Sequence, residues 1–519
     1  MTGWLAEQGR IYFRNANSVK DYRIQLRSTK TAWYWAIYLG VLVLVAISNY
    51  GAIENSAWNR SASGVQSSLT TYYQIVSGFI HAAILLIAPM LAASAIVSEY
   101  ELQSMDLVKC SPTSSKYFFV GKYLAVMRQV GLLLFLALPI AAVGVTLGGA
   151  TWAEIFEQFG YMYMQAGLAT AIAVPLAVST KTVIRTVFGY FGVMFGFSFL
   201  LMILALLSMG AGFTVVPPFV GLIPFASAFS VGKSLPIFGV EIPNWVSAGI
   251  LTTIFVKVLL LGAGSAMTRA GSKETLSLRL HGLLLVGLLS AIIGWSYGSL
   301  PPMPTGQTER LTALFVALCL PAYLVVGLAL AVAAHGRTEE RKFFADRLFV
   351  LQDTWRGRPS GAIGFLLIAT MMMAAASILP FELMGRIRNL EIALSVGWIL
   401  SFVMFSFALV WLVSTSFDDA VASRRAVTGF GFLIGASPMA LGVALQYLWN
   451  TLDVPWGLRL NPFIPYAETY VMMGVKTLVL MVLGVLLLWW GEKRRKKNLD
   501  VMRSRGQKVD RDEIVGSAT

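Results

Sequence analysis

The residues best placed to make polar contacts lie in a short charged segment between two long apolar runs. The segment covers residues 97–122 and reads VSEYELQSMDLVKCSPTSSKYFFVGK. Apolar residues recur every three positions from Leu102 to Val108 and Pro112 ends the pattern, which predicts a short helix over 99–110. Its acidic residues would lie near the helix amino terminus, where they suit the helix dipole. Such a helix can present charged groups beside one apolar face.

Two lysines lie near the middle of long apolar runs, Lys257 and Lys476. An ammonium group at membrane depth is costly, and it usually faces a polar cavity or a partner. Either lysine could therefore line a pathway for an anionic substrate. The alternative is that the side chain reaches the membrane surface by snorkelling. The sequence leaves both interpretations open.

Residue types suited to catalysis or metal binding are sparse. The only cysteines are Cys110 and Cys319, and with three His in the chain no metal-ligand spacing occurs. No set of His, Asp and Glu at membrane depth has acid–base spacing. A Gly-x-x-x-x-Gly-Lys-Ser/Thr phosphate loop is also absent. A membrane-embedded enzyme is therefore the least favoured class.

The elements that position these residues are membrane helices. The chain is 57% hydrophobic and only 13% charged, and its apolar runs are too long for the strands of an outer-membrane barrel. This predicts an all-α polytopic membrane protein with about twelve transmembrane helices. The expected spans are 31–50, 74–97, 120–147, 160–178, 186–208, 245–268, 281–298, 311–334, 361–380, 393–415, 427–448 and 466–490.

The distribution of Lys and Arg predicts the orientation of these spans. The first thirty residues are polar and basic, so we expect no cleavable signal peptide and a signal anchor at 31–50. With the amino terminus in the cytosol, most of the 40 Lys and Arg fall in cytosolic segments. The net charge of +14 then reflects topology rather than nucleic-acid binding. We expect a multi-pass protein of the cell (inner) membrane with both termini cytosolic.

A weak internal repeat suggests two six-helix halves. Ile223-Pro224-Phe225-Ala226 precedes the sixth span, and Ile464-Pro465-Tyr466-Ala467 precedes or begins the twelfth. Two parallel halves are the economical interpretation. The expected organisation is an amphipathic elbow segment at 1–30, a first half at 31–268, a second half at 269–491 and a basic tail at 492–519.

The segment at 97–122 resembles the signature of type-2 ABC transporter permeases. Those proteins usually carry Glu-x-Glu after the second span, a Gly-Thr-Leu-Glu-like run, a Pro, and a Gly-Lys that opens the third span. The matching positions here are Glu99 and Glu101, then Gln103-Ser104-Met105-Asp106, then Pro112, then Gly121-Lys122. Gln103 stands where the family has Gly. The resemblance covers residues 1–270, whereas the corresponding loop at 335–361 keeps the charge but not the motif.

The resemblance implies a membrane-spanning permease subunit of an ATP-binding cassette transporter, by family habit an exporter, without enzymatic activity of its own. A separate ATPase subunit would bind ATP and Mg, so no cofactor is expected in this chain. Other expected partners are membrane lipid and, if only the first half is permease-like, a second permease chain, but no nucleic acid. The residues expected to couple the permease to the ATPase are Glu99, Glu101, Met105, Asp106, Lys109, Pro112, Gly121 and Lys122.

Two alternatives stay open. The charges of the segment at 97–122 could simply keep a solvated loop out of the bilayer. The whole chain could also be a gradient-driven secondary transporter, because twelve spans in two halves is a common carrier architecture. Carriers of that kind place acidic residues within spans, and Glu468 near the start of the last span is the nearest case here.

Overall fold

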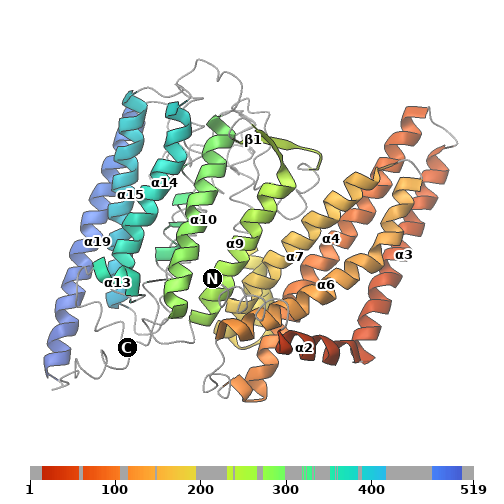
Figure 1. Ribbon diagram of the computed structural model, residues 1–519, viewed down its shortest axis with the longest axis horizontal. Coiled ribbons are helices and arrows are strands. Elements are labelled where there is room, and N and C mark those ends of the chain that lie inside the picture. Colours follow the sequence, from red (N-terminus) through yellow and green to blue (C-terminus); the bar gives the residue numbers. More distant parts are fainter. Residues whose placement is uncertain are drawn as a thin grey trace, which may run out of the picture. The chain divides into compact units, whose positions relative to one another are not determined.

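The computed structural model consists mainly of long helices (Figure 1). It describes residues 15–27, 29–57, 62–105, 115–146, 149–194, 231–237, 240–265, 273–298, 351–356, 358, 361–383, 389–416 and 470–504, with several positions between 318 and 332. A two-stranded sheet of β1 (Ser234–Ile237) and β2 (Val240–Pro243) precedes the helix that begins at Asn244.

Nine of the described helices are long and apolar enough to cross a membrane, so the protein is an all-α polytopic membrane protein. These spans are Thr31–Gly51, Ser68–Glu101, Ser115–Thr146, Trp152–Thr180, Asn244–Ser265, Thr275–Trp295, Ala362–Pro380, Leu390–Leu409 and Val471–Lys497. Each corresponds to a predicted span. Three predicted spans are described only in part or not at all. The structure describes 186–208 only to residue 194, within the shorter apolar helix Val183–Met194, and 311–334 only at scattered helical positions. The span 427–448 lies outside the described residues. The count of twelve therefore stays a prediction.

The helices group into two units, which are described here separately. The first unit contains α2 (Ala16–Arg27), α3 (Thr29–Ala57), α4 (Ala62–Glu101), α6 (Ser115–Thr146), α7 (Trp152–Thr180) and most of α9 (Asn244–Ser265). The second contains α10 (Lys273–Gly298), α13 (Leu351–Arg356), α14 (Ala362–Leu383), α15 (Asn389–Ser416) and α19 (Tyr470–Ser504). The elbow segment is described only from residue 15, and the basic tail only to residue 504.

In the first unit α4 packs against α3, α6 and α7. Gly144 of α6 approaches Tyr73 of α4, and at the other end Lys122 of α6 contacts Glu99 of α4. Contacts at these positions require α4 and α6 to run antiparallel. The carboxyl end of α4 and the amino end of α6 therefore meet, which brings the two ends of the charged segment together.

The helix α7 is longer than the predicted span 160–178 because a capping box fixes its start. The Thr151 hydroxyl accepts from the backbone N–H of Glu154 at 3.3 Å, and the Glu154 carboxylate accepts from the Thr151 N–H at 2.7 Å. This reciprocal pair satisfies two N–H groups that have no partner within the helix. The helix thus begins well before the apolar run from which the span was predicted.

The second unit has a core of large apolar side chains on α10, α14, α15 and α19. Trp398 of α15 is fully buried and stacks on Phe402 at 4.9 Å between ring centres. The helices α15 and α19 run parallel, because Gly397 lies against Thr477 near their amino ends and Gly491 against Trp411 near their carboxyl ends. Two glycines at these contacts allow the helices a close approach.

Candidate functional site

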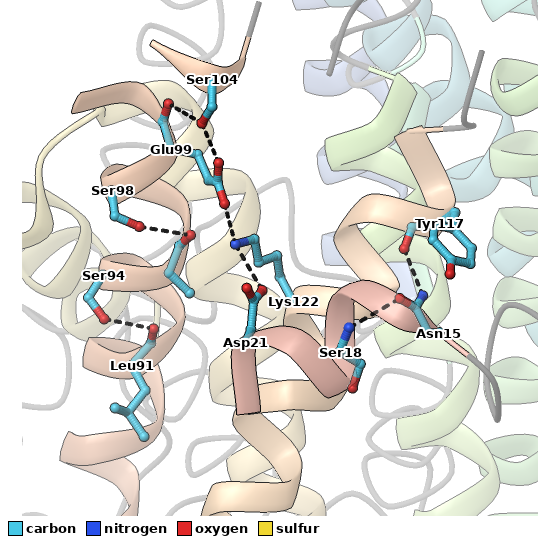
Figure 2. Close-up of polar contacts among 11 residues, drawn as sticks. Asn15, Ser18, Asp21, Leu91, Ser94, Ser98, Glu99, Ser104, Tyr117 and Lys122 are labelled. Atoms are coloured by element: carbon cyan, nitrogen blue, oxygen red, sulfur yellow. Dashed lines mark hydrogen bonds and ion pairs between the residues drawn. The ribbon is translucent and has the colours of Figure 1, made fainter. Parts of the chain in front are cut away.

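Lys122 forms the centre of a buried ion-pair cluster at the start of α6. Its Nζ lies 2.5 Å from Glu99 Oε1 at the end of α4 and 2.9 Å from Asp21 Oδ2 on α2 (Figure 2). Only 7% of the Lys122 side chain is exposed, against 13% for Asp21 and 18% for Glu99. One cation therefore joins three helices in a place that water barely reaches. We call Lys122, Asp21, Glu99 and Ser104 the Lys122 cluster.

Ser104 completes the cluster on the other side of Glu99. Its hydroxyl donates to the second oxygen of the Glu99 carboxylate and lies 3.1 Å from the Glu99 carbonyl oxygen (Figure 2). The carboxylate thus has both oxygens engaged, one by the ammonium group and one by the hydroxyl. Charge-assisted hydrogen bonds of this kind are stronger than neutral ones, and together they fix the Glu99 side chain.

The amino end of α2 is fastened to the first turn of α6. Asn15 donates from Nδ2 to the Tyr117 carbonyl at 2.9 Å, and its Oδ1 accepts from the Ser18 N–H at 3.2 Å as a helix cap. The Ala16 N–H donates to the Tyr117 hydroxyl at 2.8 Å. Figure 2 shows this cap beside the Lys122 cluster. The elbow helix is therefore held at its amino end by hydrogen bonds and further along by the ion pair.

Gly121 is required by the closeness of α2 to α6. A Cβ atom at this position would lie 2.6 Å from Asn15 Oδ1 and 3.0 Å from the Cβ of Asn17. Any side chain here would push the elbow helix away. Gly121 and Lys122 therefore have separate roles in this chain. Gly121 leaves room for α2 to approach α6, and Lys122 forms an ion pair with Asp21 of α2.

The prediction of a separate helix over 99–110 is wrong at its start, and residues 106–110 of it lie outside the described residues. The helix α4 continues through the membrane span to Glu101, and Leu102 and Gln103 then form a turn. Gln103 has φ +55°, in the left-handed region that favours glycine. The periodicity of the apolar residues could not reveal this break. Gln103 is the position where the resembling family has Gly, so the backbone adopts the conformation that a glycine there would suit.

The other residues predicted to couple to the ATPase differ in how far their side chains are exposed. Glu101 and Gln103 are exposed, as is Leu102 with 76% of its surface accessible, whereas Met105 is buried. Asp106, Lys109 and Pro112 lie outside the described residues. An exposed surface at the end of α4 therefore lies directly beside the buried Lys122 cluster.

The two predicted pathway lysines differ in burial and belong to different units. Lys257 of α9 is half-buried in the first unit, and Lys476 of α19 is 3% exposed in the second. Glu391, in the first turn of α15, is fully buried in the same unit as Lys476. The apolar pattern did not point to Glu391, because this residue lies just before the predicted span 393–415.

Two further polar contacts are buried, one in each unit. The His81 ring of α4 hydrogen-bonds to Gln165 of α7, and both are buried. In the second unit the Arg279 guanidinium donates to the carbonyls of Asp353 and Thr354, each at 2.9 Å. Single polar residues in apolar runs carry no signal about their partners, so only the packed helices identify these pairs.

The described residues contain no group of three or more His, Cys, Asp or Glu that could hold a metal ion. The Lys122 cluster has its charged groups occupied by one another, which suits a structural connection rather than acid–base chemistry.

No protein-family model matches the chain, and no curated protein matches it either.

Proposed function

We propose that this chain is the membrane-spanning permease subunit of an ATP-binding cassette exporter whose ATPase is a separate subunit. The observation that carries the proposal is the Lys122 cluster, which ties α2 and α4 to α6 at the segment that resembles a permease signature. The exposed residues Glu101 and Leu102 lie at the end of α4, next to this cluster. In this proposal the ATPase binds there, on the cytosolic side.

The cluster gives such a partner a mechanical connection to the membrane helices. A force on the end of α4 reaches α6 through Glu99 and Lys122, and α2 through Lys122 and Asp21. Because the three charges are packed together and nearly excluded from water, separating them is costly. The three helices would then move as one body when the nucleotide-binding subunits close. The protein would be inserted in the cell membrane with both termini in the cytosol.

The direct test is co-purification of the full chain with a phosphate-loop ATPase encoded beside it. Glu101→Lys should weaken that complex and its substrate-stimulated ATP hydrolysis, because Glu101 is exposed and its reversal leaves the Lys122 cluster intact. Glu382→Lys is the matched control, since Glu382 is exposed at the carboxyl end of α14. A complex that forms equally with both variants would remove Glu101 from the docking surface. Failure to find any ATPase partner would contradict the permease assignment.

A gradient-driven transporter is the second candidate, and Glu391 is the observation that favours it. A fully buried carboxylate on α15, in the unit that also buries Lys476, could carry a proton or bind a cation. Transport that persists after ATP depletion but stops with an ionophore and with Glu391→Gln would support this candidate. Transport that stops on ATP depletion while the ion gradient is maintained would support the permease.

A further inference from the structure

The carboxyl-terminal part of α19 carries aromatic and basic side chains where its apolar run ends. Trp489 and Trp490 are 66% and 50% exposed, and five consecutive basic residues follow at 493–497. Exposed Trp beside Lys and Arg marks the level of lipid headgroups. This turn of α19 therefore lies at a membrane surface, at the level of the lipid phosphate groups.

A shallow groove of about 510 Å³ runs along this part of the helix. Its lining residues are Leu486, Trp489, Trp490, Lys493, Arg494 and Lys497. The first three supply apolar surface and the last three supply positive charge. The groove thus changes from apolar to cationic in the direction in which α19 leaves the membrane.

The aromatic rings hold the cations at the groove. Lys493 Nζ lies 5.5 Å from the ring centre of Trp489, and Arg494 Cζ lies 5.9 Å from that of Trp490. Cation–π contacts of this geometry restrain long side chains that would otherwise move freely. On the other side of the helix, Glu492 pairs with Arg495 at 2.5 Å, so its negative charge is directed toward Arg495.

The groove faces away from the helix on which α19 packs. Thr477, Gly484 and Gly491 lie against α15, at seven-residue intervals along one side of α19. With 3.6 residues per turn, Leu486, Lys493 and the other groove residues lie on the opposite side. Among the described helices, α15 therefore does not cover the groove.

We propose that this groove is a binding site for an anionic phospholipid. The lipid phosphate would lie between Lys493 and Lys497, one helical turn apart, and an acyl chain would follow Leu486 and Trp489 toward the membrane interior. The order of apolar and cationic surface matches the order of chain and headgroup in such a lipid. The proposal does not depend on the transport function or on an ATPase partner.

The test is native mass spectrometry of the full chain in detergent, with phosphatidylglycerol or phosphatidylcholine added at equal mole fraction. Phosphatidylglycerol should be retained more strongly, and K493Q/K497Q should weaken its apparent affinity by at least about fivefold. K496Q removes a charge from the same helical turn at a residue that does not line the groove, and it keeps the Glu492–Arg495 pair. It should leave retention close to that of the original protein, whereas K497Q alone should lower it. K493R/K497R keeps both charges and should retain the lipid.

Three outcomes would overturn the proposal. Equal losses in K497Q and K496Q would mean that general surface charge holds the lipid. Equal retention of the two lipids would mean that the headgroup charge is not recognised. Displacement of phosphatidylglycerol by excess inorganic phosphate would assign the cations to a free anion instead.

Discussion

At the residue scale, the most consequential arrangement is one lysine between two carboxylates. The pairing of Lys122 with both Asp21 and Glu99 leaves a net negative charge, which the Ser104 hydroxyl and the nearby positive charge of Lys20 offset. Removing one member of a buried ion pair is more damaging than replacing all members by neutral groups. The order of effects among substitutions therefore tests whether the cluster acts as described.

Lys122→Met should lower the free energy of unfolding by up to about 3–5 kcal/mol, because two carboxylates with little exposed surface lose their cation. Asp21→Asn should cost less, since Glu99 still pairs with Lys122. Thermal or denaturant unfolding in detergent measures both. The combination D21N/E99Q/K122M serves as the control and should recover part of the loss. Equal stability of K122M and the original chain would show that the cluster contributes nothing.

Gly121→Ala should destabilise the protein by about 1–3 kcal/mol, as overpacked substitutions usually do. The new Cβ would lie 2.6 Å from Asn15 Oδ1 and would displace the cap of α2. Gly160→Ala on α7 is the matched control, because nothing lies within 4 Å of a Cβ there. Protease sensitivity of α2 reports the displacement directly. A G121A variant as stable as G160A would contradict the close approach.

Gln103→Gly should raise the free energy of unfolding by up to about 1 kcal/mol, since a left-handed conformation costs roughly that much for a residue with a Cβ. The φ of +55° at Gln103 is the reason for this expectation. Gln103→Ala keeps the Cβ and should not gain this stability. Unfolding midpoints of the two variants decide the matter, and an equal gain in both would show that the backbone there is not left-handed.

At the scale of elements, helix direction carries information that single spans do not. The helices α15 and α19 run parallel, and so do α10 and α14, where Gly282 lies against Phe365 and Gly294 against Ser377. Parallel neighbours in a membrane require an odd number of crossings in the chain between them. The predicted span 311–334 lies between α10 and α14 in the chain, and the predicted span 427–448 lies between α15 and α19. A single crossing in each interval meets this requirement.

Cysteine labelling can test the parallel arrangement. Leu390 and Val471 are exposed at the amino ends of α15 and α19, and Trp490 is exposed near the carboxyl end of α19. In a background without Cys110 and Cys319, cysteines at 390 and 471 should react with an impermeant reagent from the same side of the membrane. A cysteine at 490 should react from the opposite side. Labelling of 390 and 471 from opposite sides would rule out the parallel arrangement.

At the scale of the whole molecule, the described helices separate into two units with most contacts inside each. The first unit ends within α9, at Ala263, and the predicted division is at residue 268. Each unit has a buried cation that holds a short helix against the spans: Lys122 binds α2, and Arg279 binds the carbonyls of α13. The two cations have different partners, so the second unit does not repeat the contacts of the first.

The chain divided between residues 268 and 269 should therefore yield two fragments that each insert into the membrane. Fragment 1–268 should keep the protease resistance of α2 that the Lys122 cluster provides, because all three charged members lie within it. The same fragment carrying K122M is the control and should lose that resistance. A fragment 1–268 that is degraded as readily as its K122M variant would show that the first unit needs the second.

The sequence by itself determined that this is a helical membrane protein and where nine of its spans lie, because burying a helix in lipid requires a long apolar run that can be read directly. It also singled out residues 97–122 and the pair Gly121-Lys122. Tertiary structure alone decided what those residues contact. Asp21 and Lys122 lie far apart in the chain, and neither periodicity nor composition says which carboxylate a buried cation meets. The turn at Gln103 and the burial of Glu391 likewise depend on how helices pack, which is a property of pairs of segments rather than of one segment.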